Sequence, residues 1–382
     1  MSKGKYLRKQ KVSTGKKIGR TALIILLVLV LLIGAVLAFV WSKLSKITYD
    51  DGSLKTPTSV VDVDPTGPAL DATDPIDATE TETEPEDIVS LDGLEMMTAP
   101  ILSSGKLFEN DDVMNILVVG TDELVEGFVN NARGDVNMLV SINKKAGTVK
   151  LVSFSRGIGL KILDGPYKGK YDLLTHVHRW AGTSATIQAM EEVFKIEIDH
   201  YVRVNFTTVK CVVDAIGGIE INLTKAEAEY LNWYNENVNN MATTPTQKPC
   251  VEGVNLLDGG MACHYARLRR VDDDWVRMDR QRTVVLQTVE KLKGSSFSTL
   301  NNLCDMVLPL IQTNLSTIEI AELILYSPKF LDSEFDQLEI PIPNSYGGMT
   351  VMNGGGAWAL DYEKNNAVLH DFLYGAETSG VG

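Results

Sequence analysis

The sequence has few of the residues, and none of the short patterns, that mark the commonest enzyme classes. It contains 4 cysteines and 5 histidines, in neither a C-x-x-C nor an H-E-x-x-H arrangement, which argues against zinc sites and thioredoxin-type chemistry. G-x-S-x-G, Walker A and G-x-G-x-x-G patterns are also missing, so acyl transfer and nucleotide hydrolysis lose support. The chemistry therefore has to be sought in residues spread over several elements.

Acidic residues are missing from residues 1–20, which hold eight Lys or Arg, and residues 21–40 carry no charge of either sign. A hydrocarbon core of ~30 Å needs about 20 helical residues, so we predict a basic cytoplasmic tail followed by a transmembrane helix at 21–41. The apolar run is long for a signal peptide and has no small-residue cleavage site, which favours a retained anchor. Because positive residues stay inside, the rest of the chain is expected outside the membrane.

Basic residues are nearly missing from residues 48–98, where Lys55 stands against 14 Asp or Glu interleaved with Thr and Pro. Such a segment buries too little apolar surface to offset the entropy of ordering it. We therefore predict a disordered, extended linker at 42–98 and a single extracytoplasmic domain at 99–382.

The predicted domain has no excess of positive charge, with 25 Lys or Arg against 36 Asp or Glu in residues 99–382. This balance argues against general nucleic-acid binding and favours a specific anionic ligand wherever arginines gather locally. All of the cysteines lie in this domain, where disulfides are permitted. Cys250 and Cys263 are near enough in sequence to pair across a loop, and the sequence leaves their redox state open.

Apolar, β-branched runs intermix with stretches of helical spacing from residue 114 onward. We predict strands at 114–120, 136–142, 148–154, 200–205, 219–223 and 335–342. Helices are predicted at 184–194, 209–216, 260–268, 275–293, 300–310 and 318–326. Residues 143–147 read as a hairpin turn with Gly147 at positive φ, and the polar stretch 231–256 as a surface insertion. The fold class is α/β, with a mixed sheet and helices on both faces.

Candidate site residues stand where the predicted strands end and where one helix begins. The pieces are residues 115–122, 133–135, 155–156, 265–269 and 277–281. Arginine holds phosphate in a fixed, two-pronged geometry. Asp122 follows a buried strand, where α/β folds place ligand sites, and Asp135 begins the next strand. Arginines converging beside two carboxylates predict a pyrophosphate site with a divalent metal such as Mg²⁺, or alternatively Mn²⁺.

Structural roles explain some of these positions as well. A structural role explains the two aspartates as well as a metal site does. Asp122 would then be a turn residue, and Asp135 would pair with Arg133. Arg277 in a first helical turn opposes the helix dipole, so an anion is expected there, and we favour a ligand over residues 272–274. Arg267 and Arg269, beside another arginine, also fit a plain basic surface patch.

At these residues the chain resembles the LytR–CpsA–Psr family of bacterial cell-envelope proteins. The resemblance covers roughly residues 114–292 and agrees with the predicted membrane topology. Its segments are NILVVGTD (115–122), RGDVNMLVSINKKAGTVKLVSFSR (133–156), LLTHVHRWAG (173–182), DHYVRVNF (199–206), VDAIGGIEINL (213–223) and LDGGMACHYARLRRVDDDWVRMDRQR (257–282). This ordered set is far more specific than any single segment.

The resemblance implies a three-layer α-β-α domain with an apolar pocket for a polyprenyl chain. It implies transfer of a glycopolymer from a polyprenyl pyrophosphate carrier to peptidoglycan, forming a phosphodiester link, with Mg²⁺ as cofactor. Carried over position by position, Asp122 and Asp135 would hold the metal. The pyrophosphate would be bound by Arg133, Arg156, Arg267, Arg269, Arg277 and Gln281, with Arg156 and Arg277 acting beside the two aspartates in catalysis.

The chain departs from the family pattern at two positions. Gly157 stands where the family usually has Asp after the Ser-x-x-Arg arginine, and Leu173 where many members have Lys; Lys168 or Lys170 is a candidate replacement for the latter. These departures leave two alternatives open besides transfer. One is hydrolysis of the lipid pyrophosphate by water, and the other is a non-catalytic lipid-binding or regulatory envelope protein.

Overall fold

The computed structural model describes residues 42, 45–49, 91, 93–123, 128, 131–237, 249–268, 274–293, 297–320, 322–323, 326 and 335–375. The chain divides into two units, Met1–Lys46 and Ile47–Gly382. The predicted tail and transmembrane helix at 21–41 lie outside the described residues, as does most of the predicted linker. Within the described part of the chain, no helix combines the length and apolar character needed to cross a membrane.

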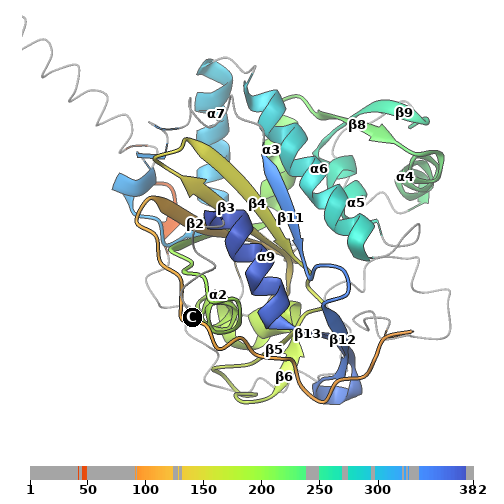
Figure 1. Ribbon diagram of the computed structural model, residues 1–382. Helices are drawn as coiled ribbons and strands as arrows, with labels where there is room; N and C mark the ends of the chain where they lie inside the picture. Colours follow the sequence, from red (N-terminus) through yellow and green to blue (C-terminus); the bar gives the residue numbers. More distant parts are fainter. Residues whose placement is uncertain are drawn as a thin grey trace, which may run out of the picture. The chain divides into compact units, whose positions relative to one another are not determined.

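A seven-stranded mixed sheet forms the centre of the second unit, in the order β1-β10-β7-β2-β3-β4-β11 (Figure 1). Its strands are β1 (Thr48–Tyr49), β2 (Val113–Thr121), β3 (Gly134–Asn143), β4 (Thr148–Phe154), β7 (His200–Asn205), β10 (Gln312–Thr313) and β11 (Asp336–Ile340). The predicted hairpin is confirmed: β3 and β4 pair antiparallel, and Gly147 in their turn has φ 71°. Glycine adopts that left-handed conformation without steric cost.

The strand directions gather several chain ends at one edge of the sheet. β2 runs parallel to β7, and β3 runs antiparallel to both β2 and β4. The C-terminal ends of β2, β4 and β7 and the N-terminal end of β3 therefore meet at the same edge, which we call the site edge. Thr121, Gly134, Phe154 and Asn205 are the strand residues at this edge.

The two faces of the sheet are packed differently because side chains alternate along each strand. On one face Leu117, Leu139 and Val152 are fully buried in a core that includes residues of α2 (Leu174–Phe194) and α9 (Tyr362–Tyr374). On the other face a second core includes Leu286 of α6 (Asp274–Lys293). Helices thus lie on both faces of the sheet, as the fold class predicts.

A third core joins elements that lie beyond the second face (Figure 1). Its elements are α3 (Phe206–Ala215), β8 (Ile219–Leu223), α4 (Lys225–Asn237), β9 (Gly253–Leu257), α5 (Gly259–Arg267) and α6, with α7 (Phe297–Val307) nearby. Two short antiparallel pairs complete the described elements, β5 (Gly159–Lys161) with β6 (Tyr171–Leu173) and β12 (Tyr346–Thr350) with β13 (Gly356–Leu360).

Two expected elements differ from the structure. α2 begins at Leu174, ten residues before the predicted start, because helical turns continue on both sides of a kink at Gly182, where φ is 77° and ψ is 179°. The stretch predicted as a surface insertion, 231–256, contains the second half of α4 and all of β9 except Leu257. A capping box starts α4, since the Thr224 N–H donates to the Glu227 carboxylate and the Glu227 N–H donates to the Thr224 hydroxyl.

The folded domain also begins earlier than residue 99. Thr48–Tyr49 pairs with β10 as an edge strand. The Met97 N–H donates to the Gly348 carbonyl at 2.7 Å, which joins the segment to β12. These parts of the predicted linker are therefore structured.

Candidate active site

Asp122 and Arg133 contact each other at the site edge. The Arg133 backbone N–H donates to Asp122 Oδ1 at 2.8 Å, and Arg133 Nε donates to Asp122 Oδ2 at 3.0 Å. Arg133 is 1% exposed. Because both carboxylate oxygens accept from the same arginine, the two side chains hold each other in one orientation.

Asp135 is the point at which three elements meet. The β2–β3 register shifts here, with Gly120 opposite Val136 and Thr121 opposite Gly134, so Asp135 is the extra residue of a β-bulge. Bulges re-aim side chains next to active sites.

The carboxylate of Asp135 accepts hydrogen bonds from Arg156 Nη1 at 3.2 Å and from the Thr175 hydroxyl at 3.1 Å. Arg277 Nη2 lies 3.5 Å from its other oxygen. Arg156 follows β4, Thr175 opens α2, and Arg277 is on α6, so groups from both faces of the sheet meet at this carboxylate. The predicted convergence of Arg133, Arg156 and Arg277 on two aspartates is what the structure shows.

The two carboxylates interact electrostatically. Burial raises the pKa of Asp122 above its ordinary value, and the charge of Asp135 raises it further, in opposition to the charge and hydrogen bonds of Arg133. Two like charges held together in a partly desolvated site favour binding of a cation between them or protonation of one of them.

The donor set fits a hard divalent cation. Asp122 and Asp135 offer carboxylate oxygens, which Mg²⁺ prefers, and Mg²⁺ usually takes one or two carboxylates together with phosphate oxygens and water. Among the described residues no group of three or more His, Cys, Asp or Glu could hold a metal by itself. The residues therefore suit an ion that is shared with a phosphate ligand and do not form an all-protein cage.

The other residues predicted to bind pyrophosphate are Arg267, Gln281 and Arg269. The Arg267 guanidinium stacks on the Phe206 ring at 4.7 Å, and Phe206 directly follows β7 at the site edge. Gln281 is half-buried on α6, one turn after Arg277. Arg269 and the alternative anions at 272–273 lie outside the described residues. The structure therefore brings Arg267 to the site edge through its contact with Phe206.

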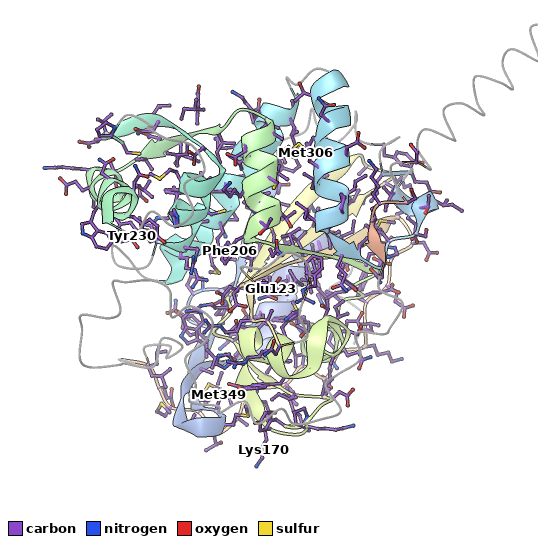
Figure 2. The ribbon with its side chains drawn as sticks, turned by 180° about the vertical axis from the view of Figure 1, so that it is seen from behind. Glu123, Lys170, Phe206, Tyr230, Met306 and Met349 are labelled. Atoms are coloured by element: carbon purple, nitrogen blue, oxygen red, sulfur yellow. The ribbon has the colours of Figure 1, made fainter. Side chains whose placement is uncertain are left out.

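Sequence reasoning missed a buried ion pair beside the site. Arg203 of β7 pairs with Glu123, the residue after Asp122, and donates to Gln312 Oε1 at 3.3 Å. The two charges are almost fully buried, and Figure 2 shows Glu123 at the centre of the molecule, near Phe206 in that view. An Arg inside a run of β-branched residues in the sequence was the available signal.

His178 supports the loop that carries Arg133. Burial, and then the charge of Arg203, lowers the pKa of His178 to about 3, so its ring is neutral. A carbonyl can only accept, so Nδ1–H donates to the Ala132 carbonyl at 2.8 Å and Nε2 accepts from the Thr183 hydroxyl at 3.1 Å. Both ring nitrogens of His178 are therefore used in packing the loop.

Leu173 and Gly157, where the chain departs from the family pattern, lie in different surroundings. Leu173 is 3% exposed and belongs to the main core. Lys170 is exposed in the turn before β6, and Figure 2 places it at the margin, well away from Glu123. Lys170 therefore does not replace a positive contact at the site edge. Gly157 lies beside Arg156, and its N–H donates to the Ser155 hydroxyl at 3.3 Å.

An apolar strip leads inward from the site edge on the sheet face toward α6. Val118, Val136, Val140 and Val202 sit on neighbouring central strands, yet each remains only partly buried. Ile116 and Met138, which pair with Val140 and Val118 on the same face, are buried. We call these four valines, which pack against the second core, the open strip.

The described cysteines are free thiols: Cys211, Cys250 and Cys263. Cys250 and Cys263 therefore do not form the pairing that their spacing permits. Burial raises the pKa of the Cys263 thiol to about 12, so it remains protonated and unreactive.

Comparison with known proteins decides the family. Residues 73–369 match the model of the LytR_cpsA_psr family. The chain belongs to this family. A relative from Enterococcus faecalis, the polyisoprenyl-teichoic acid–peptidoglycan teichoic acid transferase TagU, is 30% identical over 234 residues, or 60% of this chain and 71% of that protein.

A second relative and two solved structures are also similar to the chain. The Bacillus subtilis transferase TagT is 30% identical over 210 residues, which cover 54% of this chain and 61% of that protein. A crystal structure of a Streptococcus agalactiae protein has a TM-score of 0.56 at 22% identity, covering 69% of this chain and 86% of that one. The B. subtilis TagT structure has a TM-score of 0.50 at 23% identity, covering 73% and 98%. These structures share the fold.

Proposed function

We propose that the protein transfers a glycopolymer from a polyprenyl pyrophosphate carrier to peptidoglycan and forms a phosphodiester link. The observation that carries the proposal is the meeting of Arg156 and Arg277 with Asp135 at an edge that opens onto an apolar strip. The arginines would bind the pyrophosphate, and the apolar strip would bind the prenyl chain. The relatives TagU and TagT are named for transfer of teichoic acid to peptidoglycan, which supports the same assignment.

The reaction is a substitution at phosphorus. A hydroxyl oxygen of the acceptor glycan bonds to the sugar-proximal phosphorus, the bridging P–O bond breaks, and polyprenyl phosphate leaves with that bonding pair while the hydroxyl proton is released. Negative charge builds on the phosphoryl oxygens, and preorganised arginines stabilise such charge better than water does. Arg133, Arg156 and Arg277 are held in place by aspartates before substrate binds.

We propose Mg²⁺ as the cofactor, with Mn²⁺ as an alternative, held by Asp122 and Asp135 together with substrate oxygens. The bound ion would offset the negative charge of the pyrophosphate. The carboxylate pair supports this assignment because burial, and then the charge of Asp135, raises the pKa of Asp122, and a bound cation would offset both effects.

Mg²⁺ binding is expected to weaken at acidic pH. This effect can be measured by protein stability, without an activity assay. Mg²⁺ needs ionised Asp122, whose raised pKa means that it takes up a proton at a higher pH than an ordinary aspartate. We expect the rise in unfolding midpoint on adding Mg²⁺ to be full above this raised pKa and to vanish as pH falls through it. Without Mg²⁺, lowering the pH has the opposite effect on stability at this residue. Because the pKa of Asp122 is higher in the folded state than in the unfolded state, protonation of Asp122 stabilises the fold.

Thermal unfolding of the purified protein with and without Mg²⁺, from about pH 4 to pH 8, measures both effects. Asp122→Asn should lose the Mg²⁺-dependent rise, whereas the exposed Asp112→Asn, whose partner is Lys145, should keep it. A full rise in the Asp122 variant would remove Asp122 from the metal site.

The prenyl chain is placed on the open strip. Val136 directly follows Asp135 in β3. If the phosphates of a lipid contact the arginines at Asp135, the first part of its prenyl chain would therefore lie beside Val136. Burial of prenyl carbon against this surface contributes about 25 cal/mol per Å². Anchoring by the predicted helix at 21–41, with the domain outside the membrane, would keep the site close to such a carrier.

Reconstitution tests the proposed function against hydrolysis. The full chain in detergent, given a polyprenyl pyrophosphate-linked oligosaccharide, should release polyprenyl phosphate much faster when peptidoglycan oligomers are present. Release at an equal rate without acceptor, with no glycan joined to the oligomers, would identify a hydrolase instead. Binding of the carrier with no release in either condition would identify a lipid-binding or regulatory protein.

A further inference from the structure

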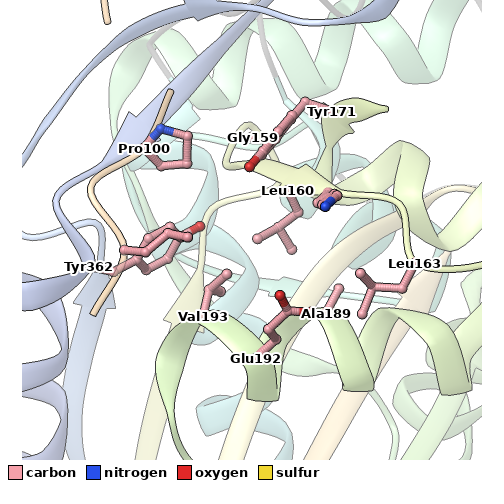
Figure 3. Close-up of a pocket in the computed structure, with 11 residues that line it drawn as sticks. Pro100, Gly159, Leu160, Leu163, Tyr171, Ala189, Glu192, Val193 and Tyr362 are labelled. Carbon is pink, nitrogen blue, oxygen red and sulfur yellow. The ribbon is translucent and has the colours of Figure 1, made fainter. Parts of the chain in front are cut away.

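A cleft separate from the proposed active site opens on the other side of the β5–β6 pair. It is bounded by residues 100–102, by β5 and Tyr171, and by the last turns of α2 (Figure 3). The space among its lining residues, including the part that is open to solvent, is about 410 Å³. Nothing in the proposed transfer reaction uses it.

One buried polar group points into this cleft without a partner. Tyr362 is fully buried, and its hydroxyl makes no hydrogen bond to any described residue. Figure 3 shows the hydroxyl directed from the ring toward the space between Gly159 and Val193.

Backbone bonds on both sides fix the tyrosine in place. The Tyr362 N–H donates to the Ile101 carbonyl at 2.8 Å, and the Ile101 N–H donates to the Leu360 carbonyl at 3.0 Å. A buried hydroxyl left without a partner destabilises a protein, so its retention at the closed end of a cleft points to a ligand that accepts or donates there.

The walls of the cleft carry opposite charges. Lys161 ends β5 and Glu192 lies on α2; both side chains are exposed, and they form no ion pair with each other or with other described residues. Between them lie the aliphatic side chains of Leu160, Ala189 and Val193, all of which are buried. A ligand that matches all of these features has an ammonium, a carboxylate, a carbonyl or hydroxyl between them, and small aliphatic groups.

We propose that this cleft binds a short zwitterionic peptide with small apolar side chains. The peptide carboxylate faces Lys161, its ammonium faces Glu192, and its carbonyl accepts from the Tyr362 hydroxyl. Methyl-sized side chains lie on the apolar surface between the two charges. The proposal rests on the cleft alone and stands whether or not the proposed transfer reaction is correct.

The position of the cleft also gives it a route to the active site. β5 begins three residues after Arg156, and β6 ends two residues before Thr175. The Thr175 N–H donates to the Arg156 carbonyl at 3.2 Å, and the Leu174 N–H donates to the Ile158 carbonyl at 2.8 Å. The strands that wall the cleft are therefore tied to two of the groups that contact Asp135.

Alanyl-alanine is the probe, titrated calorimetrically into the full chain in detergent. We expect saturable binding that Lys161→Met and Glu192→Gln each weaken at least about fivefold, the effect of losing one hydrogen bond or ion contact. Tyr362→Phe should weaken binding similarly while leaving the unfolding midpoint equal or higher, since it removes an unpartnered buried hydroxyl. Lys145→Met, at the 79%-exposed lysine of another ion pair, is the matched control and should bind as the parent does.

The dipeptide blocked at both ends, N-acetyl-alanyl-alanine methylamide, distinguishes charge recognition from apolar adhesion. It should bind at least about tenfold more weakly than the free dipeptide. Equal binding of the blocked form, or no saturable binding of the free form, would overturn the proposal. Unchanged binding in both Lys161→Met and Glu192→Gln would do the same, even if Tyr362→Phe failed to fold.

Discussion

Replacing Asp135 by Asn is expected to lower the transfer rate by about 100-fold or more, the usual cost of removing one electrostatic contributor from an active site. The substitution keeps the shape of the side chain but removes the charge that holds Arg156 and Arg277 from two sides. It also removes one of the carboxylates proposed to hold the metal. Turnover of a lipid pyrophosphate-linked oligosaccharide, measured as polyprenyl phosphate released, gives the rate.

Loss of activity through unfolding has to be separated from this effect. Breaking a buried ion pair is itself destabilising, by about 3–5 kcal/mol, so circular dichroism and the unfolding midpoint must show that Asp135→Asn is folded at the assay temperature. Asp112→Asn, at the opposite end of β2 from the site edge, should retain parental turnover. Parental turnover in the Asp135 variant would remove this residue from the mechanism.

Replacing Arg156 or Arg277 by Lys is expected to slow transfer by about tenfold to a hundredfold, because hydrogen bonds to charged groups contribute about 1.5–3 kcal/mol. An ammonium keeps the charge but cannot make the planar, two-pronged contact with phosphate. Arg277 is 4% exposed, and its position in the first turn of α6 places a positive charge where the helix dipole disfavours one. An anionic ligand would offset that cost.

Arg282→Lys is the matched control on the same helix. Arg282 pairs with Asp279 and with Glu339 of β11, so its role joins α6 to the edge of the sheet. Its loss should lower the unfolding midpoint while leaving the catalytic rate of the folded protein within about twofold. Unchanged rates in both Arg156→Lys and Arg277→Lys would return these arginines to a purely structural role.

Much of the candidate site could be predicted because strand ends are visible in the sequence. The apolar run before Asp122 and the hairpin turn at Gly147 fix the directions of β2, β3 and β4. Those directions bring Asp122, Asp135 and Arg156 to one edge. The predicted helix at 275–293 carries Arg277 in its first turn, where an anion is expected.

The contacts that orient these groups could not be predicted, since each depends on local geometry with no distinct sequence pattern. The bulge that re-aims Asp135 appears only in the strand register. Thr175 reaches Asp135 because α2 begins ten residues earlier than its spacing indicates, across the kink at Gly182. The T-x-x-E pattern from Thr224 to Glu227 is present in the sequence, and it is the pattern that predicts the start of α4.

Tracing phosphorus through the reaction tests the central claim most directly. A carrier is prepared with ³²P at the sugar-proximal phosphorus only, and the full chain is incubated with it and with peptidoglycan oligomers in the presence of Mg²⁺. Transfer predicts that the label becomes covalently attached to the oligomers together with the glycan, while the released polyprenyl phosphate is unlabelled. Label found only in free glycan phosphate would show hydrolysis, and label that stays in intact carrier would contradict a catalytic function.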